Sequence, residues 1–356
     1  MTTTETEKHA GLLPAETSAY GVTPRPFDRT VLSDPRFSSR WDIRHSATRR
    51  MLSEEPEPAE PGLFIGMDPP QHSPYRKLVG SQFGARRLNR LRPRIEEIVA
   101  DRLDEMERVG PPVDLVSEFA LPIPLSVVLE LLGVPDSERS SLQRNTASLL
   151  SLTVPTDEML AARHAIKDLI RRLVAAKRAA PTDDVLGGLV ANSDLDDDEL
   201  TGIGFLLLLA GYESTAHMLG LGTFALLRHP EQLAALRQNP HLIDTAVEEL
   251  LRYLTVVQFG LHRTALEDVQ LNGQLIKAGQ AVMVSLTAAN RDPHRFDDPD
   301  RLDLSRTPGG QVAFGYGVHQ CLGRQLARTE MRVAFLALLR RFPTLRLAVP
   351  PQDVPM

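Results

Sequence analysis

A helical segment that is apolar on every face places the strongest constraint on the fold of this chain. Four acidic residues, Asp196 to Glu199, come directly before a long helical pattern that begins near Leu200 and contains the apolar segment Phe205 to Ala210. Carboxylates stabilise the positive end of a helix dipole, so they mark where this helix begins. Because a helix without a polar face is buried on all sides, we expect a central helix rather than a surface one.

Helical periodicity dominates the chain from Pro70 to Leu339, so we predict a mainly α fold with a small β region. Asp68 followed by two prolines is typical of an N-cap and a first helical turn. The predicted helices run through His72 and Arg76, from Leu91 to Val109 with Ile95, Ile98, Val99, Leu103 and Met106 on one face, from Leu125 to Leu132, from Leu242 to Leu254, and from just after Cys321 to about Arg341.

Two segments interrupt the helical pattern. Apolar residues flank Asn272-Gly273, a pair that takes the positive φ angles of a tight turn, so we expect a β-hairpin in a small sheet there. The segment from Arg291 to Gly310 is rich in Asp, Pro and Arg without periodicity, and we predict an irregular meander.

The charge and the composition exclude several classes of protein. The net charge of −6 favours neither nucleic acid nor an anionic membrane as a partner. The longest apolar stretch falls far short of the ~20 residues that span a bilayer. Met1 to Leu13 lacks the pattern of a signal peptide, and the single cysteine excludes an intramolecular disulfide. We therefore expect a cytoplasmic protein.

The single cysteine lies in the most informative segment, Phe314 to Gly323, which reads FGYGVHQCLG. Its glycines allow a tight turn, and Cys321 comes at a predicted helix N-terminus, where N–H groups and the helix dipole stabilise a thiolate. An isolated cysteine is more often a small buried hydrophobe. A dinucleotide site needs a third glycine where Gln320 stands, and a zinc site needs further ligands. Haem accepts one thiolate as its only protein ligand.

The segment resembles the cysteine-ligand loop of the cytochromes P-450, the haem-thiolate monooxygenases. Three further matches follow the order of that family: AGYEST at 210–215 resembles the oxygen-activation stretch of the central helix, Glu249 to Arg252 the glutamate–arginine pair, and Phe296 to Arg301 the meander. The resemblance covers about Val22 to Met356. It implies a cytochrome P-450 fold of the soluble bacterial type, trimmed at both termini, with one haem domain over 1–356 whose residues 1–21 are poorly ordered.

The resemblance also implies a set of site residues for haem b. It makes Cys321 the iron ligand, and it places Phe314, Gly315, Gly323, Ala210 and Gly211 against the haem. It assigns the propionates to His72, Arg76, Arg263 and His319, and proton delivery to Glu213, Ser214 and Thr215. Ser214 stands where most relatives carry threonine. Without the family, Glu213 is an exposed residue of an ordinary helix and each of the cations is a solvated surface residue.

The pair Glu249 and Arg252 has two readings. An exposed i,i+3 ion pair contributes only ~0.2–0.5 kcal/mol to a helix. The resemblance implies instead a buried pair that clamps the meander through Arg301 and thereby supports the cysteine loop. Neither residue is expected to act in the reaction itself.

Two clusters of arginine are candidates for binding the protein that supplies electrons. One cysteine cannot hold an iron–sulfur cluster, so the resemblance implies a separate ferredoxin and ferredoxin reductase. The docking face in this family would include two clusters, which otherwise are solvated helix faces: Arg324, Arg328 and Arg332, and Arg86, Arg87, Arg90, Arg92 and Arg94.

The function implied is a monooxygenase that uses O2 to hydroxylate or epoxidise a small organic substrate, in the manner of secondary metabolism. The alternative is a non-catalytic relative that binds a partner enzyme or carrier protein. Residues 41–67 and 142–180 would select the substrate, and their sequence contains no recognisable code for it.

Overall fold

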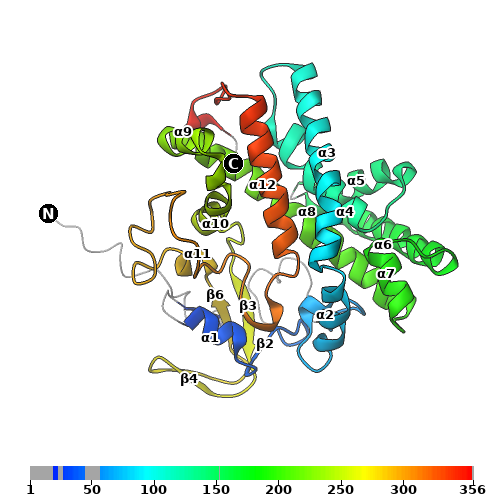
Figure 1. Cartoon of the computed structure of the whole chain (residues 1–356). Helices are drawn as coiled ribbons and strands as arrows, with labels where there is room; N and C mark the ends of the chain where they lie inside the picture. The colour runs from blue at the N-terminus through cyan, green and yellow to red at the C-terminus, as the bar shows by residue number, and fades with distance from the viewer. Residues whose placement is uncertain (1–18, 23–26, 45–56, 152, 355–356) are drawn as a thin grey trace. The chain divides into compact units, whose positions relative to one another are not determined.

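The computed structural model describes residues 19–22, 27–44, 57–151 and 153–354, and these fold into two compact units (Figure 1). The sheet unit comprises the described residues within Met1–Ala59, Ile65–His72 and Glu248–Leu322. The helical unit comprises those within Glu60–Phe64, Ser73–Val247 and Gly323–Met356. The expectation of poor order for 1–21 falls mostly outside the described residues, since only Ala19 to Gly21 of that range are described.

A four-stranded sheet with the order β1-β6-β3-β2 organises the sheet unit. Strand β6 pairs with β1 in parallel and with β3 antiparallel, and β3 pairs antiparallel with β2. Arg263 lies opposite Val282 in the β3–β6 register. The strands are β1 (Ala19–Val22), β2 (Phe37–Ser38), β3 (Leu261–Ala265) and β6 (Ala281–Val284).

The predicted hairpin is present. Strands β4 (Val269–Leu271) and β5 (Gln274–Ile276) pair antiparallel and are joined by Asn272 and Gly273. Both turn residues have positive φ, 50° for Asn272 and 76° for Gly273, as a type I′ turn requires. The identity of these two residues therefore fixes the register of the hairpin.

The helices of the sheet unit are short, and its core is apolar. Val31, Leu32 and Phe37 pack with Val282 and Val284 in one buried cluster. The segment from Arg291 to Gly310 forms neither helix nor strand, as predicted. The helical elements are α1 (Phe27–Ser33), α11 (Leu286–Ala289), a 3-10 turn at Gly317–His319, and the end of α10 (Ile243–Leu254).

The helical unit contains the long helices, and each predicted one is present. The five residues expected on the apolar face of α3 are its buried residues. No described helix has both the length and the apolar character needed to cross a membrane. The helices are α2 (His72–Ser81, which begins at the end of the sheet unit), α3 (Ala85–Val109), α4 (Pro122–Leu131), α5 (Asp136–Leu150), α6 (Thr156–Ala179), α7 (Val185–Asn192), α8 (Asp197–Arg228), α9 (Pro230–Gln238) and α12 (Arg324–Arg341).

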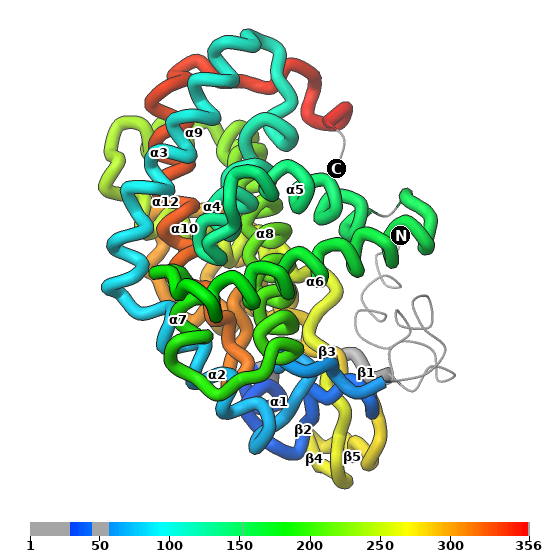
Figure 2. Tube along the Cα trace, turned by 90° about the vertical axis from the view of Figure 1, so that its right-hand side faces the viewer, coloured from blue at the N-terminus to red at the C-terminus, as the bar shows by residue number. Residues whose placement is uncertain are grey.

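Helix α8 is the central helix, as its composition predicts. It packs against α4, α6, α7 and α12 (Figure 2). Its start is fixed by a capping box, in which the Glu199 N–H donates to Asp196 Oδ1 and the Asp196 N–H to Glu199 Oε2, both at 2.8 Å. Residues 200–205 are buried without interruption. The predicted segment Phe205 to Ala210 is buried only in part: Leu206 and Leu209 are half-buried, and Ala210 is exposed.

The prediction that Asp68 caps α2 is wrong. Helix α2 begins at His72, whose N–H donates to the Asp68 carbonyl oxygen at 2.9 Å. The Asp68 carboxylate accepts instead from the Ser39 N–H at 2.8 Å and from the Ser38 hydroxyl. A tertiary contact with the end of β2 therefore takes the side chain that the local sequence assigns to the helix.

Candidate functional site

The cysteine loop folds back on itself before α12. The Cys321 N–H donates to the Phe314 carbonyl oxygen at 2.9 Å, which closes the loop over the intervening residues. Gly315 and Gly317 have φ of 67° and 74°, where side chains are disfavoured. A Cβ at Gly317 would also collide with the Leu32 carbonyl oxygen of α1. The loop therefore needs this glycine to hold a partly buried Cys321 three residues ahead of α12.

Cationic and imidazole side chains gather in the sheet unit. The rings of His72 and His319 lie with their centroids 4.3 Å apart, and His72 is buried. Arg263 on β3 is only 7% exposed, and its Nη1 donates to the His262 carbonyl oxygen at 2.8 Å. The structure thus brings two of the predicted propionate ligands together, His72 and His319, and places a third, Arg263, buried in the same unit.

The electrostatics of Arg263 favour a bound anion. Within the described residues, no carboxylate forms an ion pair with Arg263. Burial lowers the pKa of its guanidinium to about 10, and the charge of Asp68 opposes this shift only in part. Burial and the charges of Arg44 and Arg263 lower the pKa of His262 to about 4, so His262 is neutral at physiological pH. A buried cation without an ion-pair partner is costly. The residues present therefore fit the carboxylates of a haem propionate.

Arg76, the fourth predicted propionate ligand, lies one turn after His72 on α2 and is half-buried. Residues four apart share one face of a helix. Gly323 adjoins the cysteine loop as the N-cap of α12, and its Cα faces open space rather than other protein atoms.

Helix α8 carries one exposed stripe on an otherwise mostly buried surface. Ala210, Glu213, Ser214 and His217 are exposed and follow the i, i+3, i+4, i+7 spacing of a single helix face. The Ser214 hydroxyl donates to the Ala210 carbonyl oxygen at 3.2 Å. Thr215 is 4% exposed and lies outside this stripe. His217, which the sequence analysis did not single out, lies on the same face.

Gly211, the remaining predicted residue of α8, marks a close approach between helices. A Cβ at this position would lie 3.2 Å from Val128 Cγ2 of α4, which is tighter than ordinary packing. Glycine therefore allows α8 to pack against α4 directly beside the exposed stripe.

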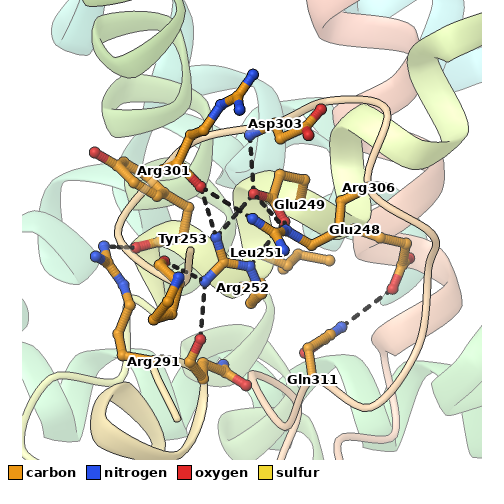
Figure 3. Close-up of polar contacts among 12 residues, drawn as sticks. Glu248, Glu249, Leu251, Arg252, Tyr253, Arg291, Arg301, Asp303, Arg306 and Gln311 are labelled. Atoms are coloured by element: carbon orange, nitrogen blue, oxygen red, sulfur yellow. Dashed lines mark hydrogen bonds and ion pairs between the residues drawn. The ribbon is translucent and has the colours of Figure 1, made fainter. Parts of the chain in front are cut away.

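The Glu249–Arg252 pair is buried, which excludes the surface reading (Figure 3). The two side chains are 1% and 2% exposed, and Arg252 Nε and Nη2 each lie 2.8 Å from a Glu249 oxygen. The remaining N–H groups of Arg252 donate to the carbonyl oxygens of Asn290, Pro299 and Arg301 at 2.7–3.1 Å. All five donors of this guanidinium are thus satisfied.

The role expected of Arg301 is divided between two residues. Arg301 supplies only its carbonyl oxygen, 3.1 Å from Arg252 Nη2. The second cation at Glu249 is Arg306, whose Nε lies 3.2 Å from Oε1 and 3.1 Å from Oε2. The Asp303 N–H also donates to Glu249 Oε1 at 3.0 Å. The clamp on the meander is confirmed, but its guanidinium comes from Arg306, which the sequence pattern did not identify.

The arginine clusters of the helical unit are largely paired with carboxylates. Asp183 binds both Arg87 and Arg90, and Arg332 contacts Asp244 at 2.5 Å. Arg92 pairs with Glu96, and Arg94 with Glu97 and Glu130. Much of the charge predicted to attract an acidic partner is therefore neutralised within the chain.

Comparisons with known proteins agree with this fold and cysteine loop, which define a haem-thiolate protein. The family model described as Cytochrome P-450 matches residues 39–355. The chain therefore belongs to the cytochrome P-450 family, and it is a haem-dependent monooxygenase.

Two curated relatives and one solved structure illustrate the similarity. The chain is 45% identical to Nocardicin C N-oxygenase of Nocardia uniformis subsp. tsuyamanensis, over 96% of this chain and 87% of that protein. It is 42% identical to Vitamin D3 dihydroxylase of Streptomyces griseolus, over 94% and 83%. The crystal structure of CYP105P1 in complex with filipin I matches with a TM-score of 0.88 and 39% identity, over 95% and 86%. These relatives are named for oxygenation, so the non-catalytic alternative has no support.

Arg306 contributes to the clamp through its guanidinium, which bonds Glu249 and the carbonyl oxygens of Asp297 and Asp298, whereas Arg301 contributes through its own carbonyl oxygen. We expect Glu249→Ala and Arg252→Ala to lose roughly 3–5 kcal/mol of unfolding free energy, because each leaves a buried charge unpaired. Arg306→Ala should lose about 1–3 kcal/mol, since a charge-assisted hydrogen bond disappears. Urea unfolding and the haem-to-protein ratio measure both effects.

Arg301→Ala is the matched control, because it keeps the carbonyl oxygen that Arg252 uses. It should be close to wild type in stability and in haem content. If Arg301→Ala is as damaging as Arg306→Ala, the Arg301 side chain contributes to the clamp after all.

Proposed function

We propose that this cytochrome P-450 hydroxylates or epoxidises a small organic molecule of secondary metabolism in the cytoplasm, and that both units together form one haem domain over 1–356. The observation that carries the proposed site is buried Arg263, a cation that makes no ion pair with a described carboxylate, in the same unit as Cys321. Nocardicin C N-oxygenase and the filipin I complex of CYP105P1 support an organic substrate of this kind.

Residues of the sheet unit, with Gly323 and Arg76 of the helical unit, would hold the cofactor. Cys321 would ligate the iron as a thiolate, with Phe314, Gly315 and Gly323 shaping the loop around it. Arg263, His72 and His319, with Arg76 on α2, would bind the propionates. Haem b bound in this way supplies the activation of O2 and the transfer of one oxygen atom to the substrate.

The exposed stripe of α8 would deliver protons. The Ser214 hydroxyl donates to a carbonyl oxygen of its own helix at 3.2 Å, a local bond that it can exchange for another acceptor. Glu213 is exposed next to it and can return a proton from water. We assign the transfer to these two residues rather than to Thr215, because Thr215 is buried outside the stripe. Ala210 and Gly211 would lie against the haem on the same helix.

Electrons would come from a separate ferredoxin and its reductase. The only cysteine of the chain is already assigned to the haem iron. Of the predicted docking residues, Arg332 is paired with Asp244, and Arg87 and Arg90 with Asp183. We keep docking on the two predicted clusters as a whole, Arg324, Arg328 and Arg332 on α12 and Arg86, Arg87, Arg90, Arg92 and Arg94 on α3, because the resemblance places them on the docking face.

The ferrous carbonyl complex tests the ligand. Because thiolate ligation shifts the main absorption band strongly to the red, the purified chain should show that band. With a substrate selected by binding spectra from polyketides, peptides, terpenes and steroids, the product should gain one oxygen atom from isotopically labelled O2. Cys321→Ala should bind haem weakly and form no product. A band typical of histidine ligation would contradict the proposal.

Substitutions at Ser214 test proton delivery. We expect Ser214→Ala to bind substrate normally while consuming reducing equivalents with less product and more hydrogen peroxide, since the positioned hydroxyl is lost. Ser214→Thr should keep the coupling, and Thr215→Val should change it little. The ratio of product to NADH consumed is the measurement. Unchanged coupling in Ser214→Ala would remove this residue from the pathway.

Charge reversal on α12 tests docking. Arg328→Glu should slow reduction of the haem by an acidic ferredoxin, and salt should slow the wild type, because the Debye length is only ~10 Å at 0.1 M. Arg340→Glu is the control, since Arg340 is exposed on the same helix about 18 Å farther along. Stopped-flow reduction over a salt series measures the rates. Equal rates for Arg328→Glu and wild type at low salt would place docking elsewhere.

A further inference from the structure

A short segment, Gln311 to Ala313, leads into the cysteine loop and is held by two amide side chains. The Val312 N–H donates to Asn290 Oδ1 at 2.8 Å, and the Ala313 N–H donates to Gln311 Oε1 at 2.6 Å. Gln311 Nε2 donates in turn to Glu248 of α10 at 3.1 Å (Figure 3). Val312 is 3% exposed, so its N–H has to find a partner within the protein.

Asn290, at the end of α11, is the residue that joins this segment to the buried ion pair. It is 0% exposed, and each of its polar groups is hydrogen-bonded. Its N–H donates to the Leu286 carbonyl oxygen, and its own carbonyl oxygen accepts from Arg252 Nη1, both at 2.9 Å. Its side chain accepts from Val312 and donates from Nδ2 to Thr255 Oγ1 at 2.9 Å.

Thr255 fixes which way the Asn290 amide points. The Thr255 hydroxyl is 2.8 Å from the Arg252 carbonyl oxygen, to which its one proton is donated. It can therefore only accept from Asn290, which directs Nδ2 towards Thr255 and Oδ1 towards the Val312 N–H. Thr255 is 1% exposed and has a φ of 41°, so the surrounding structure holds it in a conformation unusual for threonine.

Val312 passes this constraint on to the cysteine loop. Its carbonyl oxygen accepts from the Gly315 N–H at 2.7 Å, and the Phe314 carbonyl oxygen accepts from the Cys321 N–H at 2.9 Å. Hydrogen bonds thus connect Arg252 through Asn290 to Val312, and Val312 to Gly315 across the turn that precedes Cys321. The contacts of Arg252 with Pro299 and Arg301 end in the meander instead.

We propose that Asn290 is a positioning residue for the haem ligand: its side chain sets the place of Val312, and Thr255 sets the orientation of that side chain, so that Cys321 stays ordered as a thiolate ligand. The step to the ligand rests on the proposed role of Cys321. The proposed ordering of the loop does not depend on that role, because every contact named joins protein atoms of the sheet unit.

The test uses the haem-loaded full chain and the rate at which iodoacetamide alkylates Cys321. Because the chain has one cysteine, the label reports on Cys321 alone, and its rate rises when the loop opens and the thiolate becomes accessible. Asn290→Leu keeps the size of the side chain but leaves the buried Val312 N–H without its acceptor. It should be alkylated about tenfold faster than wild type, below the urea concentration that unfolds the protein, and should show a larger thiol-type fraction in its carbonyl spectrum.

Three further variants separate positioning from general loss of stability. Asn290→Asp keeps an acceptor for Val312 and should restore most of the wild-type alkylation rate. Thr255→Val should be intermediate. Thr223→Val is its matched control, since Thr223 is also 1% exposed and donates to a helix carbonyl oxygen, Leu219, at 2.8 Å. It should leave both readouts unchanged.

Two results would overturn the proposal. One is a wild-type alkylation rate in Asn290→Leu, or in Thr255→Val if Asn290→Leu does not fold. The other is an equal acceleration in the Thr255→Val and Thr223→Val variants. A wild-type protein without the thiolate-type band would instead remove the proposed role of Cys321, while the alkylation rates would still decide whether Asn290 orders the loop.

Discussion

The buried pair of Glu249 and Arg252 is the interaction on which the order of the sheet unit depends. Charges at 1% and 2% exposure are destabilising unless every donor and acceptor is satisfied. Two of the five donors of Arg252 bind Glu249. The other three bind the carbonyl oxygens of Asn290, Pro299 and Arg301, which lie outside the described helices and strands. The meander therefore takes its path from the hydrogen-bonding demand of this pair, since Arg252 binds its carbonyl oxygens and Glu249 binds Asp303 and Arg306. This explains how a segment without periodicity has one defined conformation.

Regular elements of this fold could be predicted because the information for them is local. The apolar face of α3 follows from a spacing of three and four residues, and the turn at Asn272-Gly273 follows from two residues that accept positive φ. The start of α8 is determined by the acidic residues that form its capping box. In each case residues close in sequence determine the local structure, and the tertiary contacts do not change it.

The parts that could not be predicted depend on contacts between distant residues. Asp68 has the sequence context of an N-cap, yet Ser38 and Ser39 take its carboxylate. Nothing in the spacing of the meander distinguishes the side chain of Arg301 from that of Arg306, because an irregular backbone has no period from which direction can be inferred. Asn290 escaped notice for the same reason, since its three partners beyond α11 lie 22 to 38 residues away along the chain. The cysteine loop itself was recognised by resemblance rather than by physical derivation.

The roles proposed for Cys321 and Ser214 make opposite demands on the hydrogen bonds around them. Around the cysteine loop, the hydrogen bonds of Asn290 and Val312 are 2.7–2.9 Å long and buried. If one of them breaks, its donor and acceptor cannot readily bond to water instead. A fixed ligand benefits from this rigidity. The Ser214 hydroxyl has a longer bond of 3.2 Å to a carbonyl oxygen of its own helix, which it can exchange for another acceptor. A group that passes protons has to change partners, and a buried, fully satisfied network would prevent that. Under these proposed roles, the rigid hydrogen bonds lie in the sheet unit and the exchangeable hydroxyl lies on α8.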